Sequence, residues 1–321
     1  MAESVVVTGA TGLVGSALVR RFAAEGCRVT AAVRDTARAE RMFAPLGGVR
    51  VVAWDVTSPF PGDAASAAAD WFVHAASETS SRAFVERPVE TVGSVVAGAR
   101  NALEFARSAR VRSMVFLSTM EVYGVPSAEN VTERDYGYLD PLSVRSCYPE
   151  AKRLAENLCV SYAAEYGVPV KIARLAQTFG EGVRRDDTRV FAEFARAVAG
   201  GRDIVMKTGG ETARCYCYIG DAVAAVETIL AKGENAAAYS VANEDTFCTV
   251  REMAEALVAA HPAAGSRVRF DPAGAAARGF APPFRMKLDC SRLRSLGWTP
   301  KVGLMEAYER MIAGWAACGA D

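Results

Sequence analysis

The sequence predicts an α/β protein whose main unit is a doubly wound parallel sheet, followed by a smaller C-terminal substrate-binding domain. The β-branched run Val5-Val6-Val7 predicts a buried parallel strand. Glycines at positions 9, 12 and 15 follow at once, and an apolar-periodic stretch then predicts a helix. Strand and helix signals continue to alternate through the first half of the chain, as a parallel sheet requires.

The G-x-x-G-x-x-G spacing between this first strand and helix indicates a phosphate-binding turn. Gly9 permits a tight turn, Gly12 lets a diphosphate contact the main chain, and Gly15 lets the helix pack closely on the strand. The free N–H groups at the helix N-terminus face the phosphates. We therefore expect a Rossmann-type dinucleotide site with cofactor contacts from Gly9, Thr11, Gly12, Leu13, Val14 and Gly15.

Length and composition are those of an ordinary globular protein. The 321 residues can hold one large α/β domain, or a large one and a small one. With 37 basic and 37 acidic residues, the formal charge is zero, which gives no basis for binding nucleic acid or an anionic membrane. No secretory or membrane-spanning pattern stands out, so we expect a cytoplasmic protein. Eight cysteines without a C-x-x-C pair, and two histidines, predict no metal site.

The ends of the later strands supply further expected cofactor contacts. After the predicted strand at 27–33, an NAD-binding fold usually has an acidic residue, but here Arg34 follows Val33. A guanidinium suits a ribose 2′-phosphate, so NADP is favoured over NAD, and both stay open. Asp35 is placed to contact a ribose hydroxyl. The ends of other strands add Asp55, Val56, Ala75, Ala76, Ser77, Leu117 and Leu175.

Three residues form a candidate catalytic group. Thr119 follows the predicted strand at 111–117, at the sheet edge where ligands bind. Tyr148 and Lys152 are four residues apart and therefore share one helix face. A free phenol has a pKa of about 10, and a nearby ammonium lowers it, which would let Tyr148 act as a base. Lys152 can also hold the nicotinamide ribose, so both residues are expected to contact the cofactor.

Other patterns indicate how the chain is organised. The apolar periodicity predicts one long helix over residues 84–109. Asp221 is expected to cap a helix over residues 222–230. The strand at 238–242 is expected to return to the main sheet. His74, at the inner end of a buried strand, is interpreted as structural rather than catalytic.

The expected domain division follows from where strict alternation ends. Residues 1–178 are assigned to the dinucleotide-binding domain, and residues 215–243 are expected to return to it. Residues 179–214 and 244–321 are assigned to the substrate domain. No internal repeat is evident.

The glycine turn, Thr119, Tyr148 and Lys152 together resemble the extended short-chain dehydrogenase/reductase family, in its nucleotide-sugar epimerase/dehydratase branch. The resemblance covers essentially the whole chain. It implies an NAD(P)-dependent enzyme acting on a nucleotide-diphosphate sugar, and a homodimer formed through the helices near 84–108 and 148–166. It also implies substrate contacts from Ser77, Thr119, Met120, Glu121, Gln177, Arg189 and Arg214.

The chain departs from the family pattern at two positions. Dehydratases of dTDP-glucose carry an Asp-Glu pair after the threonine, whereas this chain has Met120 and Glu121, so the usual proton donor is missing. Thr-x-Glu is similar to the pattern of nucleotide-sugar decarboxylases and GDP-mannose dehydratases. Glu121 is therefore either a second catalytic base or a structural carboxylate. Gln177 stands where the family has asparagine.

These expectations favour an epimerase that works through a transient keto-sugar. Tyr148 would take the proton from a sugar hydroxyl at C4 while hydride moves to the nicotinamide, and Thr119 would orient the same oxygen. Two alternatives stay open. One is a nucleotide-sugar decarboxylase or dehydratase that uses Glu121. The other is a net NADPH-dependent ketoreductase of the same fold.

Overall fold

The computed structural model describes residues 3–62, 69–271 and 283–317. Its larger part is a parallel seven-stranded sheet, ordered β11-β7-β5-β4-β1-β2-β3. The order reverses between β1 and β4, and doubly wound sheets bind ligands beyond the carboxyl ends of such strands. In sheet order, the strands are Ala238–Val241 (β11), Val170–Leu175 (β7), Ser113–Thr119 (β5), Trp71–His74 (β4), Ser4–Thr8 (β1), Arg28–Val33 (β2) and Val49–Ala53 (β3).

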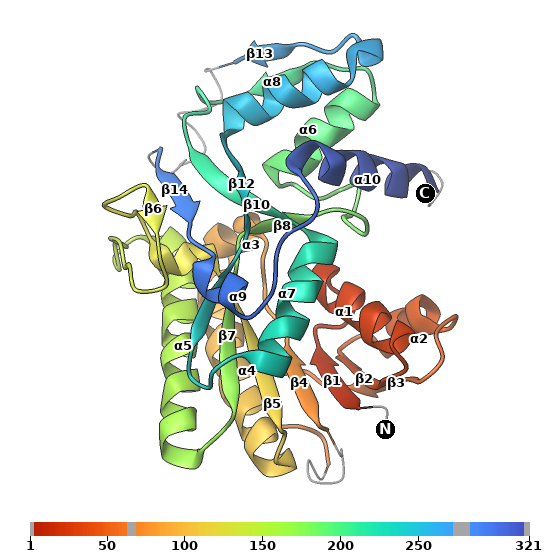
Figure 1. The fold of residues 1–321 in the computed structure, drawn as a ribbon, viewed down its shortest axis with the longest axis vertical. Coiled ribbons are helices and arrows are strands. Elements are labelled where there is room, and N and C mark those ends of the chain that lie inside the picture. The colour runs from red at the N-terminus through yellow and green to blue at the C-terminus, as the bar shows by residue number, and fades with distance from the viewer. Residues whose placement is uncertain (1–2, 63–68, 272–282, 318–321) are drawn as a thin grey trace.

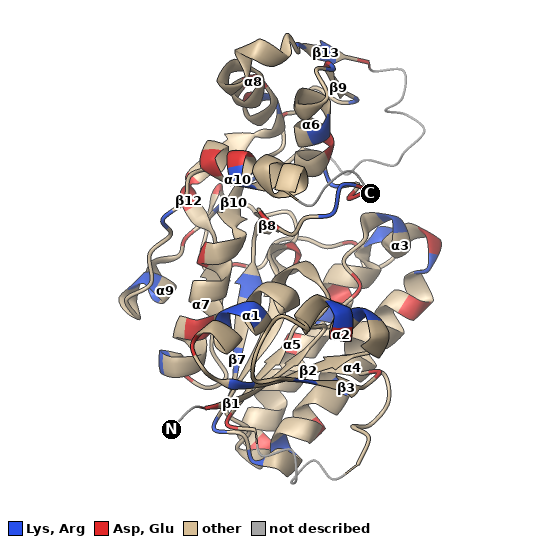
Figure 2. Ribbon diagram, turned by 90° about the vertical axis from the view of Figure 1, so that its right-hand side faces the viewer, with Lys and Arg blue, Asp and Glu red and all other residues tan. Residues whose placement is uncertain are grey.

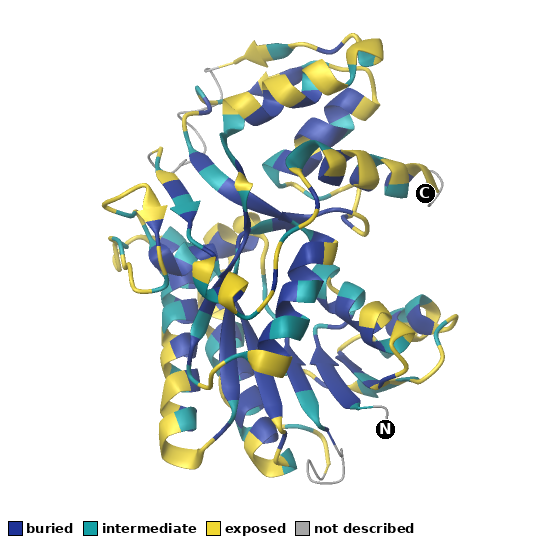
Figure 3. Ribbon diagram, in the orientation of Figure 1, coloured by how far each residue is buried: buried dark blue, intermediate teal, exposed yellow. Residues whose placement is uncertain are grey.

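Helices cover both faces of this sheet (Figure 1). α1, α2 and α7 build one core with the strands, while α4 and α5 build the other. Figure 3 shows that the strands between them are buried over most of their length, whereas α4 and α5 carry exposed residues along their outer sides. The helices are Leu13–Ala24 (α1), Thr36–Phe43 (α2), Ser81–Glu86 (α3), Pro88–Ala109 (α4), Cys147–Tyr166 (α5) and Ile219–Lys232 (α7).

The sequence explains the two elements that frame the site. β1 is buried at every position, which suits a valine run covered by helices on both faces. α5 has Pro149 in its first turn, where the missing N–H costs nothing. It ends at Gly167, whose φ of 68° is left-handed and stops the helix.

A smaller lobe lies beyond the end of the main sheet at which α1 begins (Figure 1). Its sheet has the order β12-β10-β14-β6, with β8 also pairing β10, and a separate pair joins β13 to β9. α6, α8 and α10 pack around a third core that includes Phe179, Phe191 and Tyr308. The elements are Asn130–Val131 (β6), Gln177–Phe179 (β8), Val190–Ala199 (α6), Ile204–Met206 (β9), Ala213–Tyr218 (β10), Asn243–Thr249 (β12), Val250–Ala260 (α8), Val268–Phe270 (β13), Arg285–Leu288 (β14), Ser291–Ser295 (α9) and Leu304–Ala317 (α10).

The single helix predicted over residues 84–109 is wrong. The structure has two helices, α3 and α4, because the backbone at Arg87 leaves the helical region with φ −139° and ψ 58°. Pro88 then occupies the first turn of α4, and residues before proline avoid the α conformation. The break matters because α3 carries Phe84 to the candidate site.

The predicted cap at Asp221 is also wrong, because α7 already begins at Ile219. The Asp221 carboxylate instead accepts hydrogen bonds from the N–H groups of Lys301 and Val302, each at 3.0 Å, and so anchors the C-terminal segment. The expected return of a strand to the main sheet is confirmed, since β11 pairs with β7. β10 lies in the second sheet, and the proposed domain division remains a prediction.

The surface carries both signs of charge. Figure 2 shows basic and acidic residues interspersed over the helices in that view, in line with the balanced composition. Among the described residues, no helix combines the length and apolar character needed to cross a membrane.

Candidate functional site

The glycine turn after β1 forms a cradle that side chains would fill. Gly9 has a φ of +65°, and a Cβ there would lie 2.7 Å from the backbone of Ala76. A Cβ on Gly15 would lie 2.2 Å from the carbonyl oxygen of Gly9, so α1 can pack this closely only with glycine. The N–H of Gly12 donates to that same carbonyl at 2.9 Å.

The first turn of α1 offers donors to an anion. Gly12 is the N-cap residue and has no side chain with which to cap the helix. The N–H groups of the first turn, which include those of Leu13 and Val14, have no partner within the helix. Together with the cradle, these donors fit the diphosphate of a nicotinamide dinucleotide. Thr11 lies in the turn between the two glycines, half-buried.

The ends of β2 and β3 lie where the adenosine ribose of such a cofactor would be recognised. Arg34 is exposed directly after β2. The Asp35 carboxylate caps α2 by accepting the N–H of Arg38 at 2.9 Å. The N–H and hydroxyl of Thr57 bond to Asp55 and hold the pKa of its carboxyl below the usual value.

The end of β4 is lined by small residues and a neutral histidine. His74 is buried, and its Nδ1 lies 2.9 Å from the hydroxyl of Thr8. Burial lowers the pKa of His74 to about 3, so the ring is uncharged at neutral pH, as expected of a structural histidine. Ala75, Ala76 and Ser77 follow and are half-buried, which leaves backbone accessible on this side of the glycine turn.

The three predicted catalytic side chains meet at the junction of β5 and α5. Thr119 is the last residue of β5, and its hydroxyl lies near enough to Tyr148 to act on the pKa of the phenol. Tyr148 stacks on the ring of Phe84, with ring centroids 4.3 Å apart and planes 9° apart. The Lys152 Nζ donates to the carbonyl of Leu117 at 2.8 Å and lies 5.9 Å from the centroid of the Tyr148 ring.

The pKa of Tyr148 differs from the sequence expectation. The sequence predicts a lowered value, but burial raises the pKa of Tyr148 above its usual value, and the charge of Glu121 adds to this rise. Hydrogen bonds from Thr119 and Ser77, and the charge of Arg145, act in the opposite direction. In this arrangement desolvation outweighs the groups that favour a phenolate.

Glu121 is held by a residue that the sequence analysis did not single out. Its Oε2 lies 2.9 Å from Nη2 of Arg145, in an ion pair with both side chains about one-third exposed. The Arg145 guanidinium also lies 4.9 Å above the ring of Phe84, which stacks on Tyr148. The sequence feature that could have identified Arg145 is its position, since it is a cation three residues before Tyr148. Met120 is buried in the 3₁₀ turn Met120–Tyr123.

The predicted substrate-binding residues of the smaller lobe differ in whether their hydrogen-bonding groups already have partners within the protein. Gln177 is half-buried at the start of β8. Arg189 is already paired with Asp187, with Nη2 to Oδ2 at 2.5 Å. Arg214 lies on β10, and among the described residues nothing accepts a hydrogen bond from its buried Nε. Arg214 therefore has the clearest unused capacity for an anionic ligand.

A metal centre finds no support in the part of the chain that the structure describes, where no three His, Cys, Asp or Glu side chains gather as possible ligands. The residues at the carboxyl ends of β1, β4 and β5 instead fit a nicotinamide dinucleotide. The fold and this site together define an α/β enzyme that binds such a cofactor.

The chain belongs to the NAD dependent epimerase/dehydratase family, whose sequence profile matches residues 5–243. It is 31% identical over 316 residues to UDP-glucuronic acid decarboxylase 6 of Arabidopsis thaliana, covering 96% of this chain and 87% of that protein. It is 28% identical to UDP-glucuronic acid decarboxylase 1 of Danio rerio, covering 97% and 72%.

Solved structures share the fold at lower identity. UDP-glucose 4-epimerase of Thermotoga maritima, solved with UDP-glucose, is 21% identical with a TM-score of 0.80, covering 98% of this chain and 99% of that one. UDP-N-acetylglucosamine 4-epimerase of Methanobrevibacter ruminantium is 18% identical with a TM-score of 0.85, covering 99% and 100%. The chain is thus an enzyme of this family that uses a nicotinamide dinucleotide.

Proposed function

We propose that this enzyme transiently oxidises the sugar of UDP-glucuronic acid and releases its carboxyl group as carbon dioxide. The observation that carries the oxidation is the meeting of Thr119, Tyr148 and Lys152 at the end of β5. The support for decarboxylation is the likeness to UDP-glucuronic acid decarboxylases along nearly the whole chain. This function is the alternative that the Thr119-Met120-Glu121 pattern leaves open.

The oxidation assigns one task to each of the three residues. Tyr148 takes the proton of the C4 hydroxyl, and Thr119 holds the same oxygen by a hydrogen bond. Lys152 holds the nicotinamide ribose and adds positive charge near the phenol. When bound, the oxidised nicotinamide supplies the hydride acceptor and a further positive charge. That charge opposes the rise that burial causes in the pKa of Tyr148.

Decarboxylation follows from the chemistry of the ketone. A C4 ketone lies β to the carboxylate on C5, so the C5–C6 bond breaks and its electron pair moves to the C4 oxygen as an enolate. Thr119 and Tyr148 are placed to stabilise that oxygen by hydrogen bonds. A proton then adds at C5, and hydride returns to C4. Glu121, beside Tyr148, is our candidate for the group that transfers the proton to C5.

The remaining predicted residues would hold the nucleotide sugar. Arg214 would bind the diphosphate through its unpartnered Nε. Gln177 and Met120 would line the sugar site. Arg189 would bind the substrate through the N–H groups that Asp187 does not use, or after its ion pair with Asp187 opens. Arg145 would place a cation near the substrate carboxylate.

Epimerisation at C4 is a second candidate, and one contact favours it. Glu121 is engaged by Arg145 at 2.9 Å, so its carboxylate is not free to act as a base unless that pair opens. An epimerase needs only the three-residue group, because the ketone is re-reduced on its other face.

The decisive assay incubates the enzyme with UDP-glucuronic acid and oxidised cofactor. Our proposal predicts a UDP-pentose and one equivalent of carbon dioxide, without net accumulation of reduced nicotinamide. The C4 epimer of the substrate, with no carbon dioxide, would support the second candidate. A stoichiometric change in the cofactor would instead favour a net reductase.

We further propose that the cofactor is NADP rather than NAD. Arg34 is exposed after β2 and carries a planar, charged donor group suited to a 2′-phosphate. Asp35, the nearest carboxylate along the chain, spends one oxygen on capping α2. Solved relatives with NAD, such as UDP-glucuronic acid 4-epimerase from Bacillus cereus, keep the other choice open.

A homodimer through α4 and α5 is our proposal for the assembly. The outer face of these helices exposes apolar side chains, with Val89 79% and Leu154 48% accessible. A hollow of about 1090 Å³ between α4, the segment after β3 and Leu154 is lined by apolar residues such as Val96 and by polar ones such as Arg100 and Glu104. Exposed apolar patches of this kind are typical of interfaces.

A cytoplasmic location remains a prediction from the sequence.

A further inference from the structure

A third residue continues the helix face that carries Tyr148 and Lys152. Glu156 lies four residues beyond Lys152 on α5, so the three side chains line one face of the helix. Glu156 is only 7% exposed, which is rare for a carboxylate unless it is paired.

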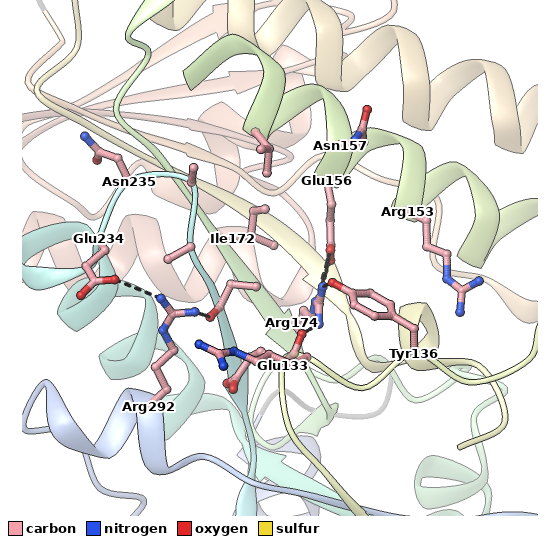
Figure 4. A pocket seen from close by; sticks show the side chains of 15 residues that line it. Glu133, Tyr136, Arg153, Glu156, Asn157, Ile172, Arg174, Glu234, Asn235 and Arg292 are labelled. Atoms are coloured by element: carbon pink, nitrogen blue, oxygen red, sulfur yellow. Dashed lines mark hydrogen bonds and ion pairs between the residues drawn. The ribbon is translucent and has the colours of Figure 1, made fainter. Parts of the chain in front are cut away.

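The partners of Glu156 come from both neighbouring strands. Arg174 of β7 makes a two-pronged ion pair, with Nε to Oε1 at 3.0 Å and Nη2 to Oε2 at 2.7 Å. Ser118 of β5 donates its hydroxyl to Oε1 at 2.5 Å. Arg174 also donates to the hydroxyl of Tyr136 at 3.0 Å. Figure 4 shows the side chains of Glu156 and Arg174 joined by dashed lines, and both residues line a cavity of about 500 Å³.

The same helix face fastens two consecutive residues of β5. Lys152 binds the carbonyl of Leu117, and Glu156 binds the hydroxyl of Ser118. Thr119 is the next residue, and it lies beside Tyr148, which is one turn before Lys152 on α5. The contacts of Glu156 therefore help to set the register between the end of β5 and α5.

The negative charge of Glu156 also acts on Lys152. Burial lowers the pKa of Lys152 to about 8, and the carboxylate of Glu156 opposes that fall. The other titratable groups around Lys152 are Tyr148 and Cys159 on α5 and His74 on β4. Burial keeps all three of them uncharged at neutral pH, by raising the pKa of Tyr148 and Cys159 and lowering that of His74 to about 3.

We propose that Glu156, with Arg174 as its counter-ion, is a positioning residue: through Ser118 it fixes the end of β5 so that Thr119 stays beside Tyr148, and its negative charge supports the neighbouring Lys152 on the same helix face. This inference rests on the proposed roles of Tyr148 and Lys152 in sugar oxidation. The Glu156 carboxylate is buried and bonded to Ser118 and Arg174, so in this proposal its effect reaches the reaction through Lys152 and Ser118.

The test measures kcat and KM against pH for Glu156→Gln in the full chain. Loss of the carboxylate lets burial act on Lys152 unopposed, so the high-pH limb of kcat moves down by about one pH unit or more. We expect kcat at pH 8 to fall roughly five-fold, and KM to change less than about two-fold. The matched control is Glu150→Gln, which removes a more exposed carboxylate from the same helix and leaves the limb in place.

Two further variants separate charge from structure. Glu156→Asp keeps the charge, and we expect the limb to return toward its wild-type position. Glu156→Gln leaves Arg174 buried and unpaired, which can unfold the protein. If circular dichroism shows that the single variant is unfolded, the double variant Glu156→Gln/Arg174→Met is measured in its place. The double variant also lacks the positive charge of Arg174, so we expect its high-pH limb to move in the same direction by a smaller amount.

The inference would be overturned if a folded Glu156→Gln variant or the double variant kept the high-pH limb of kcat at its wild-type position. This outcome is distinct from failure of the proposed function. If Tyr148→Phe keeps wild-type turnover, the oxidation itself is wrongly assigned. If Tyr148→Phe is inactive and the limb of the Glu156 variants does not move, only the role of Glu156 is rejected.

Discussion

The junction of β5 and α5 and the smaller lobe beyond the sheet prepare for a ligand in different ways. At the junction, polar groups already have partners within the protein: Lys152 donates to the carbonyl of Leu117, and Glu121 is paired with Arg145. In the lobe, Arg214 keeps a buried Nε for which the described residues provide no acceptor. The main sheet thus fixes the polar groups of the junction, whereas the lobe leaves a donor of Arg214 without an acceptor among the described residues, in line with our proposal that Arg214 binds the nucleotide sugar.

The largest effect should follow from Tyr148→Phe. Removing the hydroxyl takes away the group that we propose as the acceptor of the sugar proton, so we expect kcat to fall about 100- to 10,000-fold. The apolar stack on Phe84 remains, so the melting temperature should stay near the wild-type value. Steady-state kinetics and a thermal melt check both. A variant with normal kcat would contradict the proposal that the residues of the β5–α5 junction carry out the reaction.

Gly15→Ala should remove cofactor binding. The added Cβ would lie 2.2 Å from the carbonyl oxygen of Gly9, so α1 must move away from the turn that it closes. We expect at least a roughly 100-fold weaker cofactor affinity, since overpacking typically costs about 1–3 kcal/mol and also displaces the phosphate donors. Calorimetric titration with NAD and NADP measures it. Gly47→Ala is the control, because nothing lies within 4 Å of a Cβ at that position.

Arg214→Met should raise KM for the nucleotide sugar by about 10- to 100-fold, because charged hydrogen bonds to an anion contribute about 1.5–3 kcal/mol. The kcat value should stay within a few-fold, since Arg214 is not part of the β5–α5 junction. Arg189→Met makes the comparison sharper. Arg189 is already paired with Asp187, so a smaller rise in KM is expected. Equal effects of the two variants would contradict the contrast drawn between them.

The smallest effect is expected at the adenosine end. Arg34→Ala should weaken NADP about 10-fold and leave NAD nearly unchanged, because only NADP carries the 2′-phosphate. Competitive binding of the two cofactors to wild type and variant provides the measurement. A wild-type enzyme that prefers NAD would refute the assignment before the variant is made.

Much of the main sheet was predictable because its signals are local. The valine run, the glycine spacing and the four-residue spacing of Tyr148 and Lys152 each specify their own stretch of chain. The second sheet was not anticipated, since β14 and β6 pair across nearly half of the chain and are four and two residues long. α2 was also missed, because half of Thr36–Phe43 is polar and little of it is buried.

The site divides in the same way. The spacing on α5 predicted which side chains meet, but not how their environment shifts them, since burial depends on contacts that no spacing reveals. The raised pKa of Tyr148 is the clearest example. The pairs of Glu121 with Arg145 and of Glu156 with Arg174 join residues 24 and 18 positions apart, beyond the reach of helix periodicity.

The central claim is that a sugar hydroxyl is oxidised beside Tyr148 and that the ketone then loses carbon dioxide. Mass and NMR spectra of the product formed from UDP-glucuronic acid in deuterated water test it most directly. The account predicts a UDP-pentose with one solvent deuterium at C5 and the original hydrogen at C4. Solvent deuterium at C4, or a product that retains the carboxylate, would contradict it.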